Sequence, residues 1–187
     1  MRRRSPAGFT LVEAMIVVAI IAVMLAVSAP GLLAGLPAMR VNGAARQLLS
    51  DLRLARTRSV EQGQWVLVQF DTGADTYLLA YDVNKDNQYT VAADGDPFKQ
   101  VDLDDDYPSI LFGTTVASTS ADGVNLDSGT ANTVTFRSNG TSGESGEVYL
   151  MPSADSGTSN TDRNRRVLLI GATGNLSIES YSGGTWQ

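Results

Sequence analysis

Gly8, Phe9 and Glu13 are the residues whose types and spacing most directly indicate chemistry. Gly8 is a small residue that stands between a basic leader, Arg2-Arg3-Arg4, and an apolar run of about twenty residues, long enough to cross a membrane. A secretory signal carries its small-residue cleavage site after the apolar run, whereas here the small residue precedes that run. Cleavage between Gly8 and Phe9 would therefore remove the charged leader and leave the apolar helix on the mature protein.

Glu13 places a carboxylate inside this apolar run. Such a group costs about 3 kcal/mol to insert on translocon scales, and it usually has a partner. After cleavage the nearest positive charge would be the amino group of Phe9, which lies four residues away on the same helix face. Either Glu13 neutralises an amino terminus, or it is a tolerated acid near the interface that reaches water.

Oxygen-bearing side chains between positions 82 and 96 could hold a calcium ion. The candidate ligands are Asp82, Asn84, Asp86, Gln88, Asp94 and Asp96. Oxygens at positions one, three and five resemble the start of an EF-hand calcium loop. However, Asn87 stands where such a loop prefers glycine, and Ala93 stands where it has a bidentate glutamate. The alternative is a polar hairpin loop made of turn-forming residues.

Arg163, Arg165 and Arg166 form the densest basic cluster beyond the helical region and are a candidate contact for an anion or DNA. The alternative is that they pair with nearby acids. From Glu61 onward the chain has 18 acidic and 6 basic residues. Because this net charge repels polyanions, we expect that nucleic acid is not a partner.

The composition argues against an enzyme. The chain contains no histidine and no cysteine, which excludes a Ser-His-Asp arrangement, a thiol nucleophile and a disulfide framework. Aspartates cluster at positions 102–106, but they lack the apolar surroundings of a catalytic carboxylate pair.

One long helix is expected to organise the amino-terminal third. Residues 9–29 are apolar nearly all round and are predicted to span the membrane. Pro30, with Gly31, Gly35 and Pro37 close behind, predicts a kink. Residues 30–62 continue as an amphipathic helix that Gly63 ends. The leader arginines place the amino terminus in the cytoplasm, so the acidic domain of residues 63–187 faces outward.

That domain is predicted to be mainly antiparallel sheet. Residues 65–70 and 77–81 form a hairpin, and further strands cover residues 133–137, 147–151, 166–170 and 176–179. Turn-forming residues separate these strands. Residues 104–132 are predicted to form a variable loop with one edge strand at most.

The segment Gly8-Phe9-Thr10-Leu11-Val12-Glu13, after a basic leader and with Pro30 downstream, strongly resembles the prepilin family of type IV pilins and type II secretion pseudopilins. The resemblance implies that a membrane-bound prepilin peptidase cuts after Gly8 and methylates Phe9. It also implies that Glu13 neutralises the amino terminus of a neighbouring subunit during filament assembly.

The later sequence resembles the GspH/FimT-type minor pilins and pseudopilins. The matching features are the helix segment 48–56 and the residues Phe136, Gly140, Gly146, Thr173 and Gly174. DNA-binding members of that family carry arginines after the glycine of the last turn. Here Gly174 is followed by Asn175 and Leu176, so the resemblance does not extend to DNA binding.

The sequence therefore predicts a pilin-like α+β fold, with a long membrane-spanning helix packed on a mainly antiparallel sheet domain. The resemblance implies a structural minor pseudopilin of a type II secretion system, anchored by a single pass in the inner membrane, with its domain in the periplasm or, in the assembled filament, outside the cell. The alternative is a minor pilin of a type IV pilus, in a DNA-uptake or adhesin role. The implied partners are other pilin or pseudopilin subunits, the prepilin peptidase and the membrane.

Overall fold

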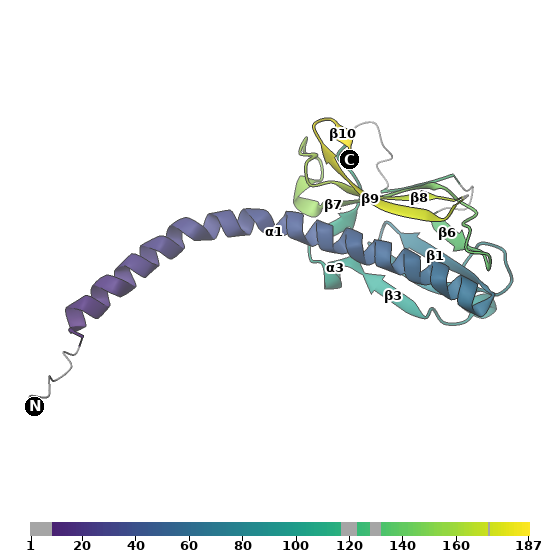
Figure 1. Ribbon diagram of the computed structural model, residues 1–187, viewed down its shortest axis with the longest axis horizontal. Helices are drawn as coiled ribbons and strands as arrows, with labels where there is room; N and C mark the ends of the chain where they lie inside the picture. The colour runs from purple at the N-terminus through teal and green to yellow at the C-terminus, as the bar shows by residue number, and fades with distance from the viewer. Residues whose placement is uncertain (1–8, 117–122, 128–131, 172) are drawn as a thin grey trace, which may run out of the picture. The chain divides into compact units, whose positions relative to one another are not determined.

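The computed structural model describes residues 9–116, 123–127, 132–171 and 173–187, with the backbone alone for residues 29–34. The longest element is helix α1 (Leu11–Gln62), which precedes two antiparallel sheets (Figure 1). The chain separates into two compact units, Met1–Leu36 and Pro37–Gln187. The first unit contains the amino-terminal part of α1, and the second contains the rest of α1 and the strands.

Helix α1 is continuous as far as its predicted end. Its α-helical backbone continues through Pro30 and Pro37, so neither proline ends the helix, and the kink expected at Pro30 stays a prediction. The helix stops at Gln62, and Gly63 follows with a φ of 64°, a conformation that glycine adopts without strain. The predicted stop is thus confirmed.

The first sheet has the strand order β3-β2-β1-β6. Its strands are β1 (Trp65–Asp71), β2 (Thr76–Asp82), β3 (Lys99–Asp102) and β6 (Thr133–Phe136). β1 and β2 form the predicted hairpin, with Trp65 opposite Asp82 and Asp71 opposite Thr76. The short helices α2 (Val91–Asp94) and α3 (Leu103–Asp106) flank β3.

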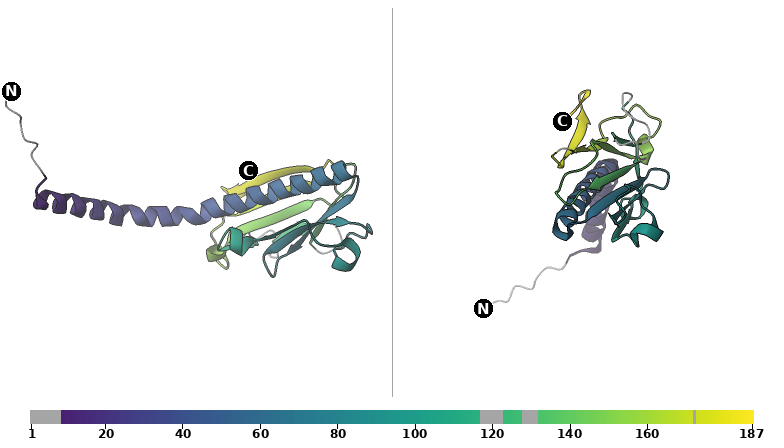
Figure 2. Two further views of the ribbon diagram at one scale, coloured as in Figure 1. Left: turned by 90° about the horizontal axis from the view of Figure 1, so that it is seen from below. Right: turned by 90° about the vertical axis from the view of Figure 1, so that its right-hand side faces the viewer.

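The second sheet has the order β10-β9-β8-β7-β4, and β5 also pairs with β7. Its strands are β4 (Ile110–Phe112), β5 (Val124–Leu126), β7 (Gly146–Pro152), β8 (Arg165–Ile170), β9 (Asn175–Ser182) and β10 (Thr185–Trp186). A short 3₁₀ turn, η1 (Ser153–Asp155), follows β7. Strand β9 runs alongside the carboxy-terminal part of α1 (Figures 1 and 2).

The strands predicted from alternating or β-rich segments are all present, but residues 104–132 contain more regular structure than the predicted loop with one edge strand. This region holds most of α3 together with β4 and β5, and β3 and β10 were not predicted either. These strands have two to four residues each. Such segments are too short to show a two-residue period, and they form because β2, β7 or β9 offers a backbone to pair with.

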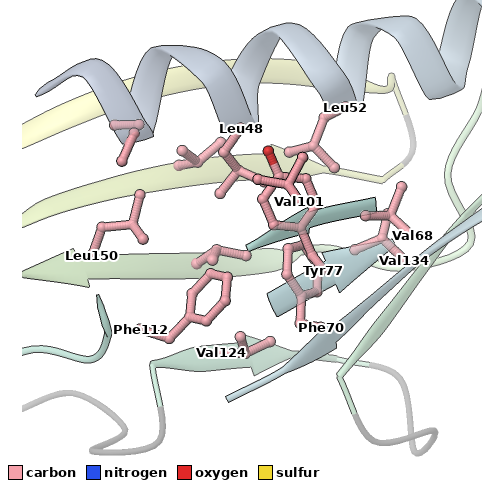
Figure 3. Packing of buried hydrophobic residues seen from close by; sticks show 14 of the residues in the cluster. Leu48, Leu52, Val68, Phe70, Tyr77, Val101, Phe112, Val124, Val134 and Leu150 are labelled. Atoms are coloured by element: carbon pink, nitrogen blue, oxygen red, sulfur yellow. The ribbon is translucent and has the colours of Figure 1, made fainter. Parts of the chain in front are cut away.

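The core lies between α1 and the sheets (Figure 3). Leu48 and Leu52 point from α1 toward the strands, where Tyr77 and Leu150 contribute side chains to the same cluster. Full burial of an apolar side chain such as Leu48 contributes about 1.5–3 kcal/mol to the stability of the folded state. The predicted apolar stripe of the helix is therefore what attaches it to the sheets.

Candidate functional site

The predicted processing and assembly residues lie at the start of α1. Gly8 is outside the described residues. Phe9 is exposed and precedes Thr10, whose hydroxyl accepts a hydrogen bond from the backbone N–H of Glu13 at 3.2 Å. Thr10 is therefore the N-cap of α1, and Glu13 occupies the third helical position, which gives the spacing of a capping box with only the Thr10 half of its hydrogen bonds formed among the described residues.

This placement adds a role for Glu13 that the sequence analysis missed. A carboxylate in the first turn of a helix is stabilised by the unpaired backbone N–H groups there. The spacing Thr-x-x-Glu before an apolar run was the available signal. The side chain of Glu13 is exposed and has no hydrogen-bond or ion-pair partner among the described residues, so it is free to meet a partner from another chain.

The segment after Glu13 is apolar and uncovered. Residues 11–28 have a mean hydropathy of 2.7, and none of them is buried within the chain. By length and composition this is a helix that could cross a membrane. Ile20 and Leu25, for example, are 52% and 64% exposed, which is costly in water but not in lipid or beside other apolar helices.

Arg56 joins the other end of α1 to the turn between β8 and β9. Its guanidinium donates to the carbonyl oxygens of Gly174 at 2.9 Å and Thr173 at 3.2 Å. A Cβ on Gly174 would lie 2.7 Å from the carbonyl oxygen of Gly140, and both glycines have positive φ values, 61° and 79°. Glycine is thus required where these two turns meet, and Gly140 and Gly174 shape the fold.

Asp51 is a buried acid on the otherwise apolar face of α1, and the sequence analysis missed it. It accepts hydrogen bonds from Tyr77 Oη at 2.7 Å, Lys99 Nζ at 2.5 Å and Gln47 Nε2 at 3.2 Å. Burial, and then the bond to Asp51, raises the pKa of Tyr77, so the phenol stays neutral. The position of Asp51, three residues after Leu48, indicated that it lies on the buried face of α1. No local feature of the sequence indicated that Lys99 would pair with it.

The candidate calcium ligands form a loop held by its own backbone. Asp82 accepts from the backbone N–H groups of Asp86 at 3.2 Å and Asn87 at 3.1 Å. Asp94 likewise accepts from Val83 at 3.0 Å and Thr90 at 2.9 Å. Burial raises the pKa of Asp82, although its backbone hydrogen bonds act in the opposite direction.

These contacts account for the loop as a polar turn. Asn84 Nδ2 donates to Asp86 at 2.8 Å, and Gln88 is joined to Asp86 through its backbone N–H, so neither amide side chain needs an ion for the loop to close. Among the described residues no group of three or more acidic, histidine or cysteine side chains is placed to hold a metal. Calcium binding by this loop, with Asp94 and Asp96, stays a prediction, which melting in calcium and in chelator would test.

The three arginines of the candidate anion site have separate partners. Arg163 pairs with Asp155, and Arg166 pairs with Glu147 and Glu179, each at 2.6 Å. Arg165 instead donates to the side-chain oxygen of Asn42 at 2.6 Å and to two backbone carbonyls. Since Arg165 and Arg166 are adjacent in β8, they project from opposite faces of the strand. The cluster in sequence is thus not one basic patch.

Two families of known proteins match this chain over different segments. Residues 3–29 match the prokaryotic N-terminal methylation motif. Residues 44–174, most of the chain, match the family described as type II transport protein GspH. The chain belongs to the GspH family. The match covers the carboxy-terminal part of α1, most of the strands and the turn at Gly174. No curated protein sequence matches the chain significantly.

Solved structures of a minor pseudopilin and of a type IV minor pilin align with this chain. The minor pseudopilin EpsH from the type 2 secretion system of Vibrio cholerae aligns with a TM-score of 0.51 and 14% identity, covering 75% of this chain and 97% of that one. The type IV minor pilin FimU of Pseudomonas aeruginosa aligns with a TM-score of 0.49 and 14% identity, covering 79% and 92%. The comparison with EpsH confirms the predicted pilin-like fold for this GspH-family chain.

Proposed function

We propose that this GspH-family protein is a structural minor pseudopilin of a type II secretion system. The observation that carries the proposal is the match of residues 44–174 to the type II transport protein GspH. The methylation motif over residues 3–29 and the uncovered apolar helix of residues 11–28 support a subunit that is stored in a membrane before it polymerises.

In this proposal a prepilin peptidase cuts between Gly8 and Phe9 and methylates the new amino terminus. The apolar part of α1 then holds the subunit in the inner membrane, with the acidic domain in the periplasm. During assembly Glu13 pairs with the amino terminus of a neighbouring subunit, because that pairing removes two charges from an apolar environment at once. The helix leaves the lipid and packs among other pilin helices.

The domain is a structural module with no catalytic role in this proposal. Its buried acids are used within the fold: Asp51 holds Lys99 and Tyr77, and Glu144 accepts the backbone N–H of Thr135 at 2.8 Å. A carboxylate tied to the fold in this way is not available as a general acid or base.

Deleting the gene and complementing it with variants tests the proposal. We expect the deletion to trap type II substrates in the periplasm, and wild-type protein to restore their release. Glu13→Ala should still enter the membrane but should fail to join filaments, whereas Glu61→Ala, which removes an exposed acid at the other end of α1, should behave as wild type. Mass spectrometry of the native protein should find a chain that starts at methylated Phe9.

Each part of the proposal has a result that would refute it. Intact secretion in the deletion strain, with loss of pilus-dependent motility or DNA uptake, would replace this proposal by the minor-pilin alternative. An intact leader on the filament-associated protein would refute processing at Gly8. Normal incorporation of Glu13→Ala would refute the pairing role of that carboxylate.

A further inference from the structure

A polar pocket of about 300 Å³ lies within the unit Pro37–Gln187, between α1 and the second sheet. Its lining residues are Asn42, Arg46, Arg165, Ile178, Ser180 and Gln187. Two of them carry a guanidinium group, and none carries an acidic side chain. This pocket differs from the unit as a whole, because residues 37–187 carry 19 acidic and 11 basic residues.

Arg165 is held in the pocket by neutral groups. Its Nε donates to Asn42 Oδ1 at 2.6 Å, and its Nη1 donates to the carbonyl oxygens of Asn164 at 2.8 Å and Asp162 at 3.1 Å. Burial lowers the pKa of Arg165, and no acid offsets that effect. Its Nη2 has no partner among the described residues. The charge of Arg165 is thus oriented but not neutralised.

Arg46 brings a second charge to the same pocket from α1. It lies one helical turn after Asn42, is exposed, and makes no hydrogen bond or ion pair within the described parts of the chain. By contrast, Arg163 and Arg166 are each paired with a carboxylate. Both guanidinium groups thus line one pocket, neither has an acidic side chain as a partner among the described residues, and an anion there can accept hydrogen bonds from them.

We propose that this pocket receives a carboxylate side chain of a neighbouring filament subunit. The inference rests on the proposed function, because assembly brings a second subunit to α1. A carboxylate suits the pocket, because it can accept paired N–H donors from arginine. A single side chain is the expected occupant because the net negative charge of the domain repels an extended polyanion.

Charge reversal at Arg46 provides the first test, in cells that carry the full-length protein. Arg46 is exposed, so Arg46→Glu is not expected to unfold the domain. We expect about ten-fold less Arg46→Glu than wild type in the filament fraction. Arg46→Lys should give an intermediate amount, because lysine keeps the charge but lacks the paired N–H donors of the guanidinium group. Arg53→Glu is the matched control, an exposed arginine of α1 outside the pocket, and should assemble as wild type.

A photo-crosslinking amino acid at Ser180 identifies the occupant. We expect a crosslinked peptide from a second subunit that contains Asp or Glu, and reversing that acid to Arg should restore the assembly of Arg46→Glu. Crosslinks to nucleic acid or lipid alone would overturn the proposal. Arg165→Gln should lose the same crosslink and should also lower the melting temperature of the domain, because it removes the hydrogen bonds of the guanidinium to Asn42 and to two backbone carbonyls.

The outcomes separate this inference from the function on which it rests. If wild-type protein enters filaments and Arg46→Glu enters equally well, the pocket proposal is wrong and the pseudopilin proposal stands. If wild-type protein never enters filaments, both fail. Equal losses for Arg46→Glu and Arg53→Glu would show a general need for a basic helix, which would also overturn the pocket.

Discussion

The two parts of helix α1 are both rich in apolar residues, yet they use them differently. From Leu11 to Ser28 the apolar side chains surround the helix, and none of these residues is buried within the chain. From Pro37 to Gln62 they form a stripe, in which Val41, Leu48 and Leu52 are at most 1% exposed. The first part therefore suits a lipid environment or contact with other helices, whereas the second part packs on the protein's own sheets.

The contrast shows that hydrophobicity alone does not indicate where a helix is stabilised. Leu25 and Leu48 have the same side chain on the same helix, but they are 64% and 0% exposed. The arrangement of polar residues separates the two cases, because Arg46, Ser50 and Arg53 mark a solvent face that the first part lacks. Matched substitutions in the two parts should therefore give different results.

The largest expected effect comes from truncating the same residue type in each part. Leu48→Ala should lower the free energy of unfolding of the domain by about 3 kcal/mol, because it removes buried contacts and leaves a cavity. Leu25→Ala should leave it unchanged. Urea unfolding in detergent, followed by the fluorescence of Trp65 and Trp186, measures both. Equal losses would mean that the two parts do not differ as described.

The buried carboxylate of Asp51 should give the next largest effect. Lys99→Met should cost about 2 kcal/mol of unfolding free energy, because it leaves Asp51 buried without its cation. Adding Asp51→Leu should recover most of that loss, since an apolar pair replaces an ionic one. A double-mutant cycle from urea unfolding reports the coupling. Additive losses would show that Lys99 does not stabilise Asp51.

A pair of arginines on α1 sharpens the comparison further. Arg56→Ala should cost about 1 kcal/mol, because it removes two hydrogen bonds that join the helix to the turn at Gly174. Arg53→Ala removes an arginine from the exposed face and should cost almost nothing. Thermal unfolding of the two variants side by side tests this. A larger effect for Arg53 would contradict the assignment of faces.

The smallest effect concerns the pH dependence of the domain. Burial first, and then neighbouring acids such as Asp104, raises the pKa of Asp75. The folded state therefore favours the protonated form, and the stability that this contributes is fully present below the unfolded pKa of about 3.9 and is lost as the pH rises through the folded value. Asp75→Asn keeps an acceptor for the N–H of Phe112 and removes the charge.

We expect Asp75→Asn to be more stable than wild type by about 0.5 kcal/mol at pH 7, a value reduced for the partial exposure of this site. The difference should shrink as the pH falls and should vanish below the unfolded pKa of about 3.9, where the carboxyl is protonated in both the folded and the unfolded state. Melting temperatures of both proteins across this pH range provide the measurement. A variant that is less stable than wild type at pH 7 would refute the prediction.

The sequence by itself determined the features that depend on neighbouring residues. The apolar run after Gly8, the stripe that includes Leu48 and Leu52, the stop at Gly63 and the hairpin between Trp65 and Asp82 all arise from local periodicity or turn chemistry. These features were enough to predict a long helix and a mainly antiparallel sheet domain, because each element signals its own type and the side that it must bury, and the resemblance to the prepilin family added the pilin-like arrangement.

Only the tertiary structure decided what depends on residues far apart in the chain. The short edge strands β3 and β4 form because another strand offers them a backbone, and Asp51 is tolerated in the core because Lys99 reaches it from 48 positions away. In the same way, folding gave Arg163 and Arg166 their own carboxylate partners and placed Arg165 and Arg46 on the lining of one pocket. Local sequence cannot specify such pairings, since the free energy that favours them exists only once the chain has brought the partners together.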